Sequence, residues 1–314
     1  MRKPLIGISA CLLGDAVRHD GGHKHYRYVT GELAQFFEFR PFCPEVASGL
    51  GVPRPALRLN MRDGAVRLQE SQNPRHDHTQ RLKRTALEAC DTLGELSGYI
   101  LKKDSPSCGM ERVRVYSGSG MPEKNGRGLF AAQLLETFPQ LPVEEEGRLS
   151  DLALRESFIE RVFVYSRWQG LLREGLTPAG LMQFHARHKF SLLSRDESVY
   201  RELGPMVAGV CKTNLDSVAE AYIENLMQAL KRPASRKRHC NVLMHLMGYF
   251  KTELSAEEKR ELLQILEEYR LGMVPLVVPI TLLKHYLRRL PNPYLLGQTY
   301  LDPYPREMRL RNAI

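Results

Sequence analysis

The first half of the chain alternates short apolar runs with amphipathic stretches. Three runs end abruptly at turn-forming residues, as buried strands do: 4–13, 39–46 and 98–101. Two longer segments, 73–98 and 128–139, carry apolar residues at helical spacing. Strands that alternate with helices favour a parallel sheet. The sequence therefore predicts an α/β domain with a mainly parallel sheet.

The pattern changes beyond a linker at 139–151, where prolines, an acidic run and a glycine follow one another. From there on, apolar positions recur at helical spacing. One helix start is clearly marked, because Thr177 is followed by Pro178, a residue favoured at the first helical position. We therefore expect two domains, residues 1–146 and residues 147–314, of which the second is all-α.

Composition narrows the class of protein. The chain has 314 residues, and its 45 Lys and Arg against 36 Asp and Glu leave a net charge of +9. A surplus spread along the chain favours polyanionic partners, although a basic cytosolic enzyme has the same balance. No apolar run reaches the roughly 18 residues of a membrane span. With six cysteines and no signal-peptide cleavage site, we expect a cytoplasmic protein with reduced thiols.

Three cysteines stand at the ends of predicted strands, namely Cys11, Cys43 and Cys108. In open α/β sheets, ligands bind at the carboxyl ends of the strands, so these thiols are expected to converge. Cys90 differs, because it lies on the apolar face of the helix predicted within 73–98. A free cysteine in that setting packs as a small hydrophobe.

The sequence around Cys108 predicts a tight turn that presents a thiol and two hydroxyls. It reads DSPSCG from Asp104, directly after a strand-like run. Pro106 fixes its own φ, and Gly109 permits a left-handed turn just past the cysteine. Such a turn suits a functional site better than a core.

The residues alone leave three kinds of site open. A structural zinc ion usually takes close pairs such as C-x-x-C, and this chain has none. A nucleophilic thiol at Cys108 could use a base from the histidine loop at 19–25. Three thiolates could instead hold a 3Fe–4S cluster, or a 4Fe–4S cluster whose open iron acts as a Lewis acid.

Three motifs carry a resemblance to a known family. SACLLG at 9–14, FCPEVASGLGVPRP at 42–55 and SPSCG at 105–109 resemble the bacterial thiouracil desulfidases, over roughly residues 1–145. One departure is His19, where relatives more often have tyrosine, and it puts any role of an aromatic hydroxyl in doubt.

This resemblance implies a cofactor and a set of site residues. Cys11, Cys43 and Cys108 would bind a 4Fe–4S cluster, whose open iron takes the thiocarbonyl sulfur while water supplies the oxygen. Glu45 and Ser105 would be catalytic: the carboxylate would orient or deprotonate the water, and the hydroxyl would relay a proton or bind the base edge. The structural alternatives are a helix N-terminal carboxylate and a turn serine that bonds its own backbone.

The second half resembles the YbgA-type domain, on the segments 184–196, 245–259 and 270–287. The fusion of the two domains resembles the tRNA 4-thiouridine desulfidases, in which the helical domain is expected to hold RNA. The implied partner is thiolated tRNA. A small thiolated uracil is the alternative substrate, and a non-catalytic iron–sulfur sensor that binds nucleic acid is the alternative function. No membrane partner is expected, and the sequence sets no oligomeric state.

Candidate RNA contacts follow from basic groups, which neutralise phosphates, and from nearby aromatic rings, which stack on unpaired bases. The alternative for the lysines and arginines is that they are ordinary solvated surface charges. The alternative for the histidine is that it packs within the protein. The candidates are Lys102, Lys103, His185, Lys189, Arg236, Lys237 and Arg238.

Overall fold

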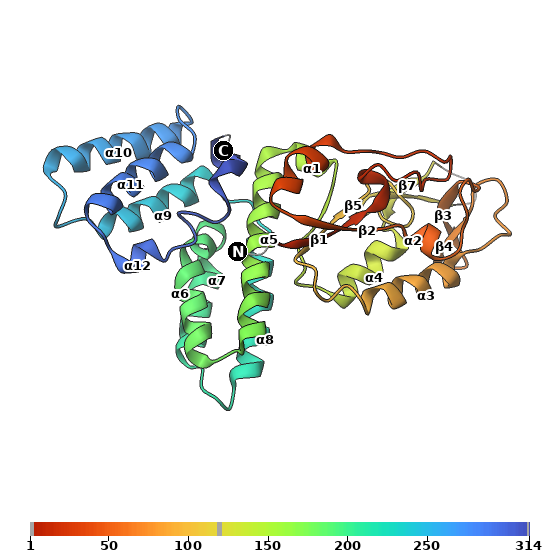
Figure 1. Ribbon diagram of the computed structural model, residues 1–314, viewed down its shortest axis with the longest axis horizontal. Helices are drawn as coiled ribbons and strands as arrows, with labels where there is room; N and C mark the ends of the chain where they lie inside the picture. The colour runs from red at the N-terminus through yellow and green to blue at the C-terminus, as the bar shows by residue number, and fades with distance from the viewer. Residues whose placement is uncertain (1–2, 118–120, 313) are drawn as a thin grey trace. The chain divides into compact units, whose positions relative to one another are not determined.

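The protein consists of two units, which are shown in a computed structural model (Figure 1). The structure describes residues 3–117, 121–312 and 314. The chain divides between Ser150 and Asp151, whereas the sequence pattern placed the boundary after residue 146. The first unit is α/β and the second is built of helices, so the predicted fold classes are confirmed.

A fully parallel four-stranded sheet organises the first unit, with the strand order β2-β1-β5-β8. Its strands are β1 (Leu5–Ser9), β2 (Glu38–Phe42), β5 (Gly98–Leu101) and β8 (Val143–Glu145). The central strands β1 and β5 are almost entirely buried, because neighbouring elements cover both of their faces. That burial explains why they appear in the sequence as continuous apolar runs.

A second sheet of mixed direction has the order β4-β3-β6-β7. Its strands are β3 (Leu57–Arg62), β4 (Ala65–Glu70), β6 (Val113–Tyr116) and β7 (Glu123–Gly126). The β3–β6 pair is parallel, and the two outer pairs are antiparallel. The β3–β4 hairpin turns through Asp63 and Gly64, whose φ values of 50° and 72° suit a two-residue turn.

Helices cover the sheets of the first unit (Figure 1). They are α1 (Arg27–Gly31), α2 (Pro44–Ala47), α3 (Thr79–Cys90) and α4 (Leu129–Thr137). The inner face of α3 buries Leu82, Ala86 and Cys90, so the apolar spacing predicted this face correctly. Leu82 also packs against Leu59 and Val115 of the mixed sheet, which joins that sheet to α3.

The second unit contains two apolar clusters that share one helix. Its helices are α5 (Leu152–Glu174), α6 (Pro178–Arg195), α7 (Glu197–Ala208), α8 (Leu215–Leu230), α9 (Arg236–Gly248), α10 (Ala256–Leu271), α11 (Val277–Arg289) and α12 (Pro293–Leu296). Helix α6 supplies Leu181 and Phe184 to the cluster with α5, α7 and α8. Further along, its Phe190 and Leu193 enter the cluster with α9, α10 and α11.

Helix α6 begins where the sequence predicts. The Thr177 hydroxyl accepts from the backbone N–H of Gly180 at 3.0 Å, and Pro178 is the first helical residue. Among the helices that the structure describes, none combines the length and the apolar character needed to cross a bilayer.

Candidate functional site

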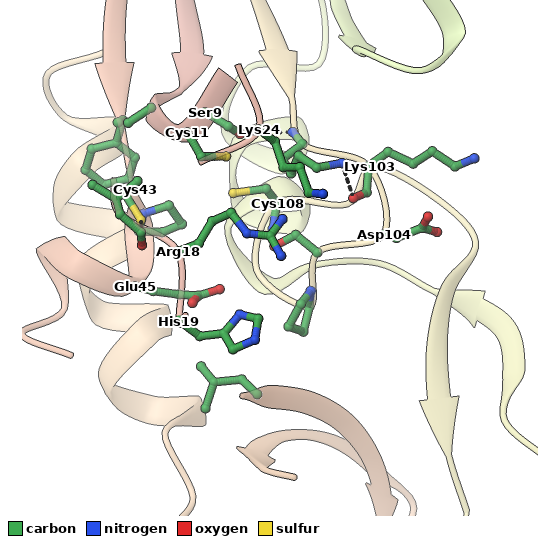
Figure 2. A pocket seen from close by; sticks show the side chains of 18 of the residues that line it. Ser9, Cys11, Arg18, His19, Lys24, Cys43, Glu45, Lys103, Asp104 and Cys108 are labelled. Carbon is green, nitrogen blue, oxygen red and sulfur yellow. Dashed lines mark hydrogen bonds between the residues drawn. The ribbon is translucent and has the colours of Figure 1, made fainter. Parts of the chain in front are cut away.

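Three cysteines from three neighbouring strands line one cavity of about 390 Å³. Cys11 follows β1, Cys43 directly follows β2 and caps α2, and Cys108 lies in the loop after β5. Because β1 lies between β2 and β5 and all three are parallel, their carboxyl ends meet at one edge. Figure 2 shows the side chains of Cys11 and Cys108 turned into this cavity.

The thiols are protected from water. Cys11 and Cys108 are 8% and 6% exposed, and none of the three is in a disulfide. Burial raises the pKa of Cys11 to about 11, and it raises the pKa of Cys108 well above its ordinary value. Nucleophilic cysteines usually have a lowered pKa, so this setting does not favour a catalytic thiol. A bound metal would displace the protons and neutralise the buried thiolates.

The donor set fits an iron–sulfur cluster better than a single ion. Within residues 3–117, 121–312 and 314, no three His, Cys, Asp or Glu side chains are arranged to hold one metal ion. In a cluster each thiolate binds a different iron, so the sulfur ligands lie farther apart than those of one ion. Three thiols around a shared cavity, two of them buried and that of Cys43 half-buried, offer the soft ligands that iron–sulfur clusters use.

The turn that carries Cys108 is shaped by Asp104 and Ser105. Asp104 adopts the left-handed φ of 59°, and the Ser105 hydroxyl accepts from the backbone N–H groups of Ser107 and Cys108 at 3.2 and 3.0 Å. The left-handed turn expected at Gly109 is wrong, since its φ is not positive. Glycine is needed there for space, because a Cβ would lie 2.9 Å from the Ser105 carbonyl oxygen.

The start of α4 clamps this turn in place. Gly128 donates its backbone N–H to the Gly109 carbonyl at 2.8 Å, and Phe130 donates to the Ser107 carbonyl at 2.9 Å. A Cβ on Gly128 would lie 2.5 Å from the Ser107 carbonyl, so the backbones approach too closely for any side chain. The position of Cys108 therefore depends on α4 as well as on β5.

Glu45 faces the cavity from the first turn of α2 and is held on both oxygens. Its Oε1 accepts from the Ser107 hydroxyl at 2.8 Å, and its Oε2 accepts from Arg54 at 2.5 and 3.0 Å. Arg54 is fixed in turn by the Val17 carbonyl at 3.0 Å. Ser105 lines the same cavity, but the serine in contact with Glu45 is Ser107.

Sequence reasoning missed several polar residues at and beside the cavity. Arg54 and Ser107 are the partners of Glu45, while Arg18 and Lys24 add positive charge to the wall. Of the loop histidines, His19 lines the cavity. Arg54 and Ser107 stand in the motifs VPRP and SPSC, but the spacing of these motifs does not show which of their residues contact Glu45 and which only form the turn.

Lys102 and Lys103 lie at the mouth of the cavity with different surroundings. The Lys102 ammonium contacts the Glu146 carboxylate and the Lys103 carbonyl, so its charge is already paired. The Lys103 ammonium is exposed and has no ion pair among the residues that the structure describes. Lys103 is therefore the freer of the two for a phosphate.

In the second unit, the candidate RNA contact Lys189 belongs to a surface that we call the Tyr249 patch, formed by Lys189, Tyr249 and Tyr294. Tyr249 is 40% exposed and stacks on Tyr294 with ring centroids 5.4 Å apart. The Lys189 ammonium lies 4.9 Å from the Tyr294 ring. His185 is half-buried, and burial and Lys189 lower its pKa to about 4, so it brings no positive charge at neutral pH.

The basic run of α9 is partly used inside the protein. Arg236 donates to the Tyr269 carbonyl at 3.3 Å, and Arg238 donates to the Arg195 carbonyl. Lys237 is exposed and has no ion pair in the described part of the chain. Of these three residues, Lys237 therefore has the charged group with the fewest contacts inside the protein.

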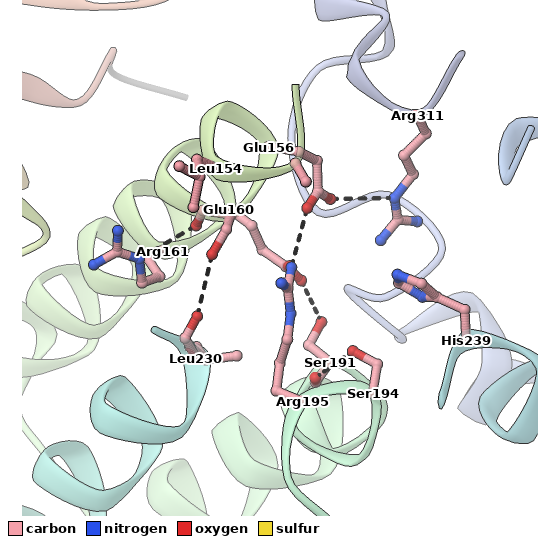
Figure 3. A network of polar contacts seen from close by, with 12 residues as sticks. Leu154, Glu156, Glu160, Arg161, Ser191, Ser194, Arg195, Leu230, His239 and Arg311 are labelled. Carbon is pink, nitrogen blue, oxygen red and sulfur yellow. Dashed lines mark hydrogen bonds and ion pairs between the residues drawn. The ribbon is translucent and has the colours of Figure 1, made fainter. Parts of the chain in front are cut away.

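Next to this run, charged side chains of α5 and α6 form a buried network of polar contacts (Figure 3). Arg195 is 2% exposed and lies between two carboxylates, Glu156 at 3.0 Å and Glu160. Glu160 also accepts from the Ser191 hydroxyl at 2.8 Å, and Glu156 accepts from the Tyr304 hydroxyl at 3.0 Å. Each charge in this Arg195 network therefore has partners.

Comparisons with known proteins match each half of the chain separately. The family model described as 2-thiouracil desulfurase matches residues 6–146, and a protein family of unknown function, DUF1722, matches residues 189–305. The uncharacterized protein YbgA of Escherichia coli (strain K12) is 35% identical over 159 residues, which cover 50% of this chain and 94% of YbgA. A solved structure of the [4Fe-4S]-dependent thiouracil desulfidase TudS is 33% identical, with a TM-score of 0.37, and covers 50% of this chain and 99% of its own.

Proposed function

Since the chain belongs to the family of YbgA and carries a 2-thiouracil desulfurase domain at residues 6–146, we propose that it is an iron–sulfur-dependent desulfidase that converts 4-thiouridine in tRNA to uridine. The observation that carries the proposal is the meeting of Cys11, Cys43, Cys108 and Glu45 around one cavity. At about 390 Å³ the cavity has the size of a small-molecule site and can take a pyrimidine base.

The proposed cofactor is a 4Fe–4S cluster held by Cys11, Cys43 and Cys108. Such a cluster leaves one iron open, and an open iron supplies a Lewis acid for a thiocarbonyl sulfur. The 33% sequence identity to TudS, whose name includes [4Fe-4S]-dependent, supports the choice of cluster. Burial raises the pKa of the Cys11 thiol, and the nearby cations Lys102 and Arg18 partly oppose that rise.

Glu45 and Ser105 are the proposed catalytic residues. Glu45 takes a proton from water as the water oxygen attacks the base carbon, and Arg54 and Ser107 hold the carboxylate in place. The Ser105 hydroxyl oxygen accepts two backbone hydrogen bonds, which leaves its proton free to donate to the base edge. Overall a thiocarbonyl and water give a carbonyl and hydrogen sulfide, and no electrons are transferred.

RNA as the substrate is supported by features of the second unit. The exposed Tyr249 stacks in the patch beside the Lys189 ammonium, and a ring in that setting can stack on an unpaired base. Lys237 and the net charge of +9 favour a polyanion. The name of the matched family, 2-thiouracil desulfurase, favours a free thiolated base as the alternative substrate.

The direct test is anaerobic cluster reconstitution followed by incubation with thiolated tRNA. We expect sulfide release in step with conversion of 4-thiouridine to uridine, measured by chromatography of the digested nucleosides. Free thiouracil run in parallel identifies the preferred substrate. Turnover of the free base as fast as the tRNA would contradict the tRNA proposal. Cluster-loaded protein that binds tRNA and releases no sulfide would support a sensor instead.

Replacing Glu45 with glutamine is expected to slow sulfide release by about 10²–10⁴-fold, the usual contribution of a positioned acid–base group. The amide introduced by this change can still accept hydrogen bonds but cannot take a proton from water. The cluster absorption is expected to stay unchanged, because Glu45 is not a proposed ligand. Glu32→Gln removes an exposed carboxylate that does not line the cavity, and it serves as the control. A Glu45→Gln rate equal to the control rate would exclude general-base catalysis by this residue.

A further inference from the structure

A second hollow, of about 260 Å³, opens beside the cysteine cavity in the first unit. Its basic lining residues are Lys103, Arg112, Arg114, Lys124 and Arg148. Lys103 and Asp104 line both hollows, so the two share a rim. The β6–β7 pair of the mixed sheet supplies Arg114 and Lys124, and neither residue is used in the proposed chemistry.

Part of the charge around this hollow is already neutralised. Arg148 pairs with Glu111 at 2.8 Å and with Glu144 at 2.6 Å. Glu145 is buried, and burial raises its pKa, while it accepts from the Met110 backbone N–H at 2.8 Å. One cation and one acid of the lining, Arg148 and Glu111, are therefore paired with each other.

Four cations of the lining have no partners among the described residues. The side chains of Lys103, Arg112, Arg114 and Lys124 are exposed, and none makes an ion pair or hydrogen bond with the residues that the structure describes. Asp104 and Glu145 are the acids that remain among the lining residues against these four cations, so the hollow keeps a positive surplus. Lining cations that lack acidic partners are free to bind an anion from outside.

The arrangement of two of these cations costs stability. Arg114 and Lys124 are directly opposite each other in the antiparallel β6–β7 pair, with a register irregularity at Val113 and Arg114. Like charges in that position destabilise a sheet, and irregularities of this kind often redirect a side chain at a functional site. A bound anion would relieve this repulsion by neutralising both cations.

We propose that Lys103, Arg112, Arg114 and Lys124 form a phosphate-binding cleft that holds the RNA backbone beside the nucleotide whose base enters the cysteine cavity. This inference rests on the proposed function and adds that the desulfidase domain itself grips the RNA. Four cations spread over a loop and two strands suit more than one phosphate, which favours a strand over a single nucleotide.

The binding test uses the full, cluster-loaded chain and unthiolated tRNA. The variant Arg114→Gln/Lys124→Gln removes the opposed cations, and Lys83→Gln/Arg84→Gln removes two exposed cations from α3, which lines neither hollow. In filter binding at several salt concentrations, we expect the first variant to bind at least about tenfold more weakly. The slope of log Kd against log salt should fall by about 1 for each lost phosphate contact. Equal behaviour of the two variants would overturn the proposal.

The activity test separates the possible substrates. For Arg114→Gln/Lys124→Gln we expect a raised KM with thiolated tRNA and an unchanged KM with the nucleoside 4-thiouridine. An equal rise with 4-thiouridine 5′-monophosphate would overturn the assignment to an RNA strand in favour of a mononucleotide. The melting temperature should stay the same or rise, since a like-charge pair is removed. If no substrate releases sulfide, the proposed function fails, and the binding test still decides this inference.

Discussion

Replacing Cys108 with alanine is expected to abolish sulfide release from thiolated uridine and to remove the iron–sulfur absorption of the reconstituted protein. The loss should exceed the roughly 100-fold that follows removal of an outer-shell partner of a metal, because Cys108 is a proposed ligand. Its position is tightly held, with 6% of the residue exposed and its loop clamped by α4. No other cysteine lines this cavity besides Cys11 and Cys43 in the part of the chain that the structure describes.

Cys90→Ala provides the matched control, since Cys90 is also a buried thiol of the first unit but lies in α3, away from the cavity. Both substitutions remove one buried sulfur and so cause similar packing losses. Iron content, visible absorption and sulfide release are measured on both after the same reconstitution. A Cys108→Ala protein with the cluster content and activity of Cys90→Ala would refute the ligand assignment.

Replacing Arg195 with methionine is expected to lower the free energy of unfolding of the second unit by about 3–5 kcal/mol. The guanidinium is 2% exposed and is the ion-pair partner of both Glu156 and Glu160. Removing it leaves two buried carboxylates without that partner, and the cost is their desolvation. If the end of α6 moved, the Arg195 carbonyl would move with it, and Arg238 would lose the acceptor of its hydrogen bond.

The chain contains a single tryptophan, Trp168, which is 4% exposed within the second unit. Its fluorescence in a urea titration therefore follows the unfolding of that unit alone. The triple variant Glu156→Gln/Glu160→Gln/Arg195→Met removes the three charges of the Arg195 network and should recover part of the loss. The recovery should stay incomplete, because buried Arg311, which lies 3.6 Å from Glu156, then loses that partner. A loss below about 1 kcal/mol for Arg195→Met would show that water reaches these groups.

The strand ends were the most informative part of the sequence. Apolar runs that stop at Cys11 and Cys43 predict a parallel sheet, and such sheets bring the ends of their strands to one edge. The structure places both thiols and Cys108 at one cavity. The apolar spacing around Cys90 likewise predicted a core residue, because burial of a helix face depends on local periodicity.

Other parts of the site depend on contacts between residues distant in sequence, which local patterns do not contain. Arg54 donates to Glu45 from the proline-rich loop that follows α2, and Ser107 reaches the same carboxylate from a turn 62 residues away. In the mixed sheet, β3 pairs with β6. The alternation of buried and exposed residues in β6 is short, and alone it does not predict which strand β6 pairs with. The expected turn at Gly109 was wrong because Asp104 takes the left-handed conformation instead.

The clamp of α4 on the Cys108 turn also sets an order for maturation during synthesis. Cys11 and Cys43 leave the ribosome early, but the turn that holds Cys108 can take its shape only after residues 128–130 have emerged. A nascent chain shorter than this contains all three cysteines but lacks the backbone contacts that fix the Cys108 turn. If the cysteines hold the proposed cluster, truncation just before Gly128 is expected to give a chain that does not retain it, because the Gly128 and Phe130 contacts to the Cys108 turn are then missing.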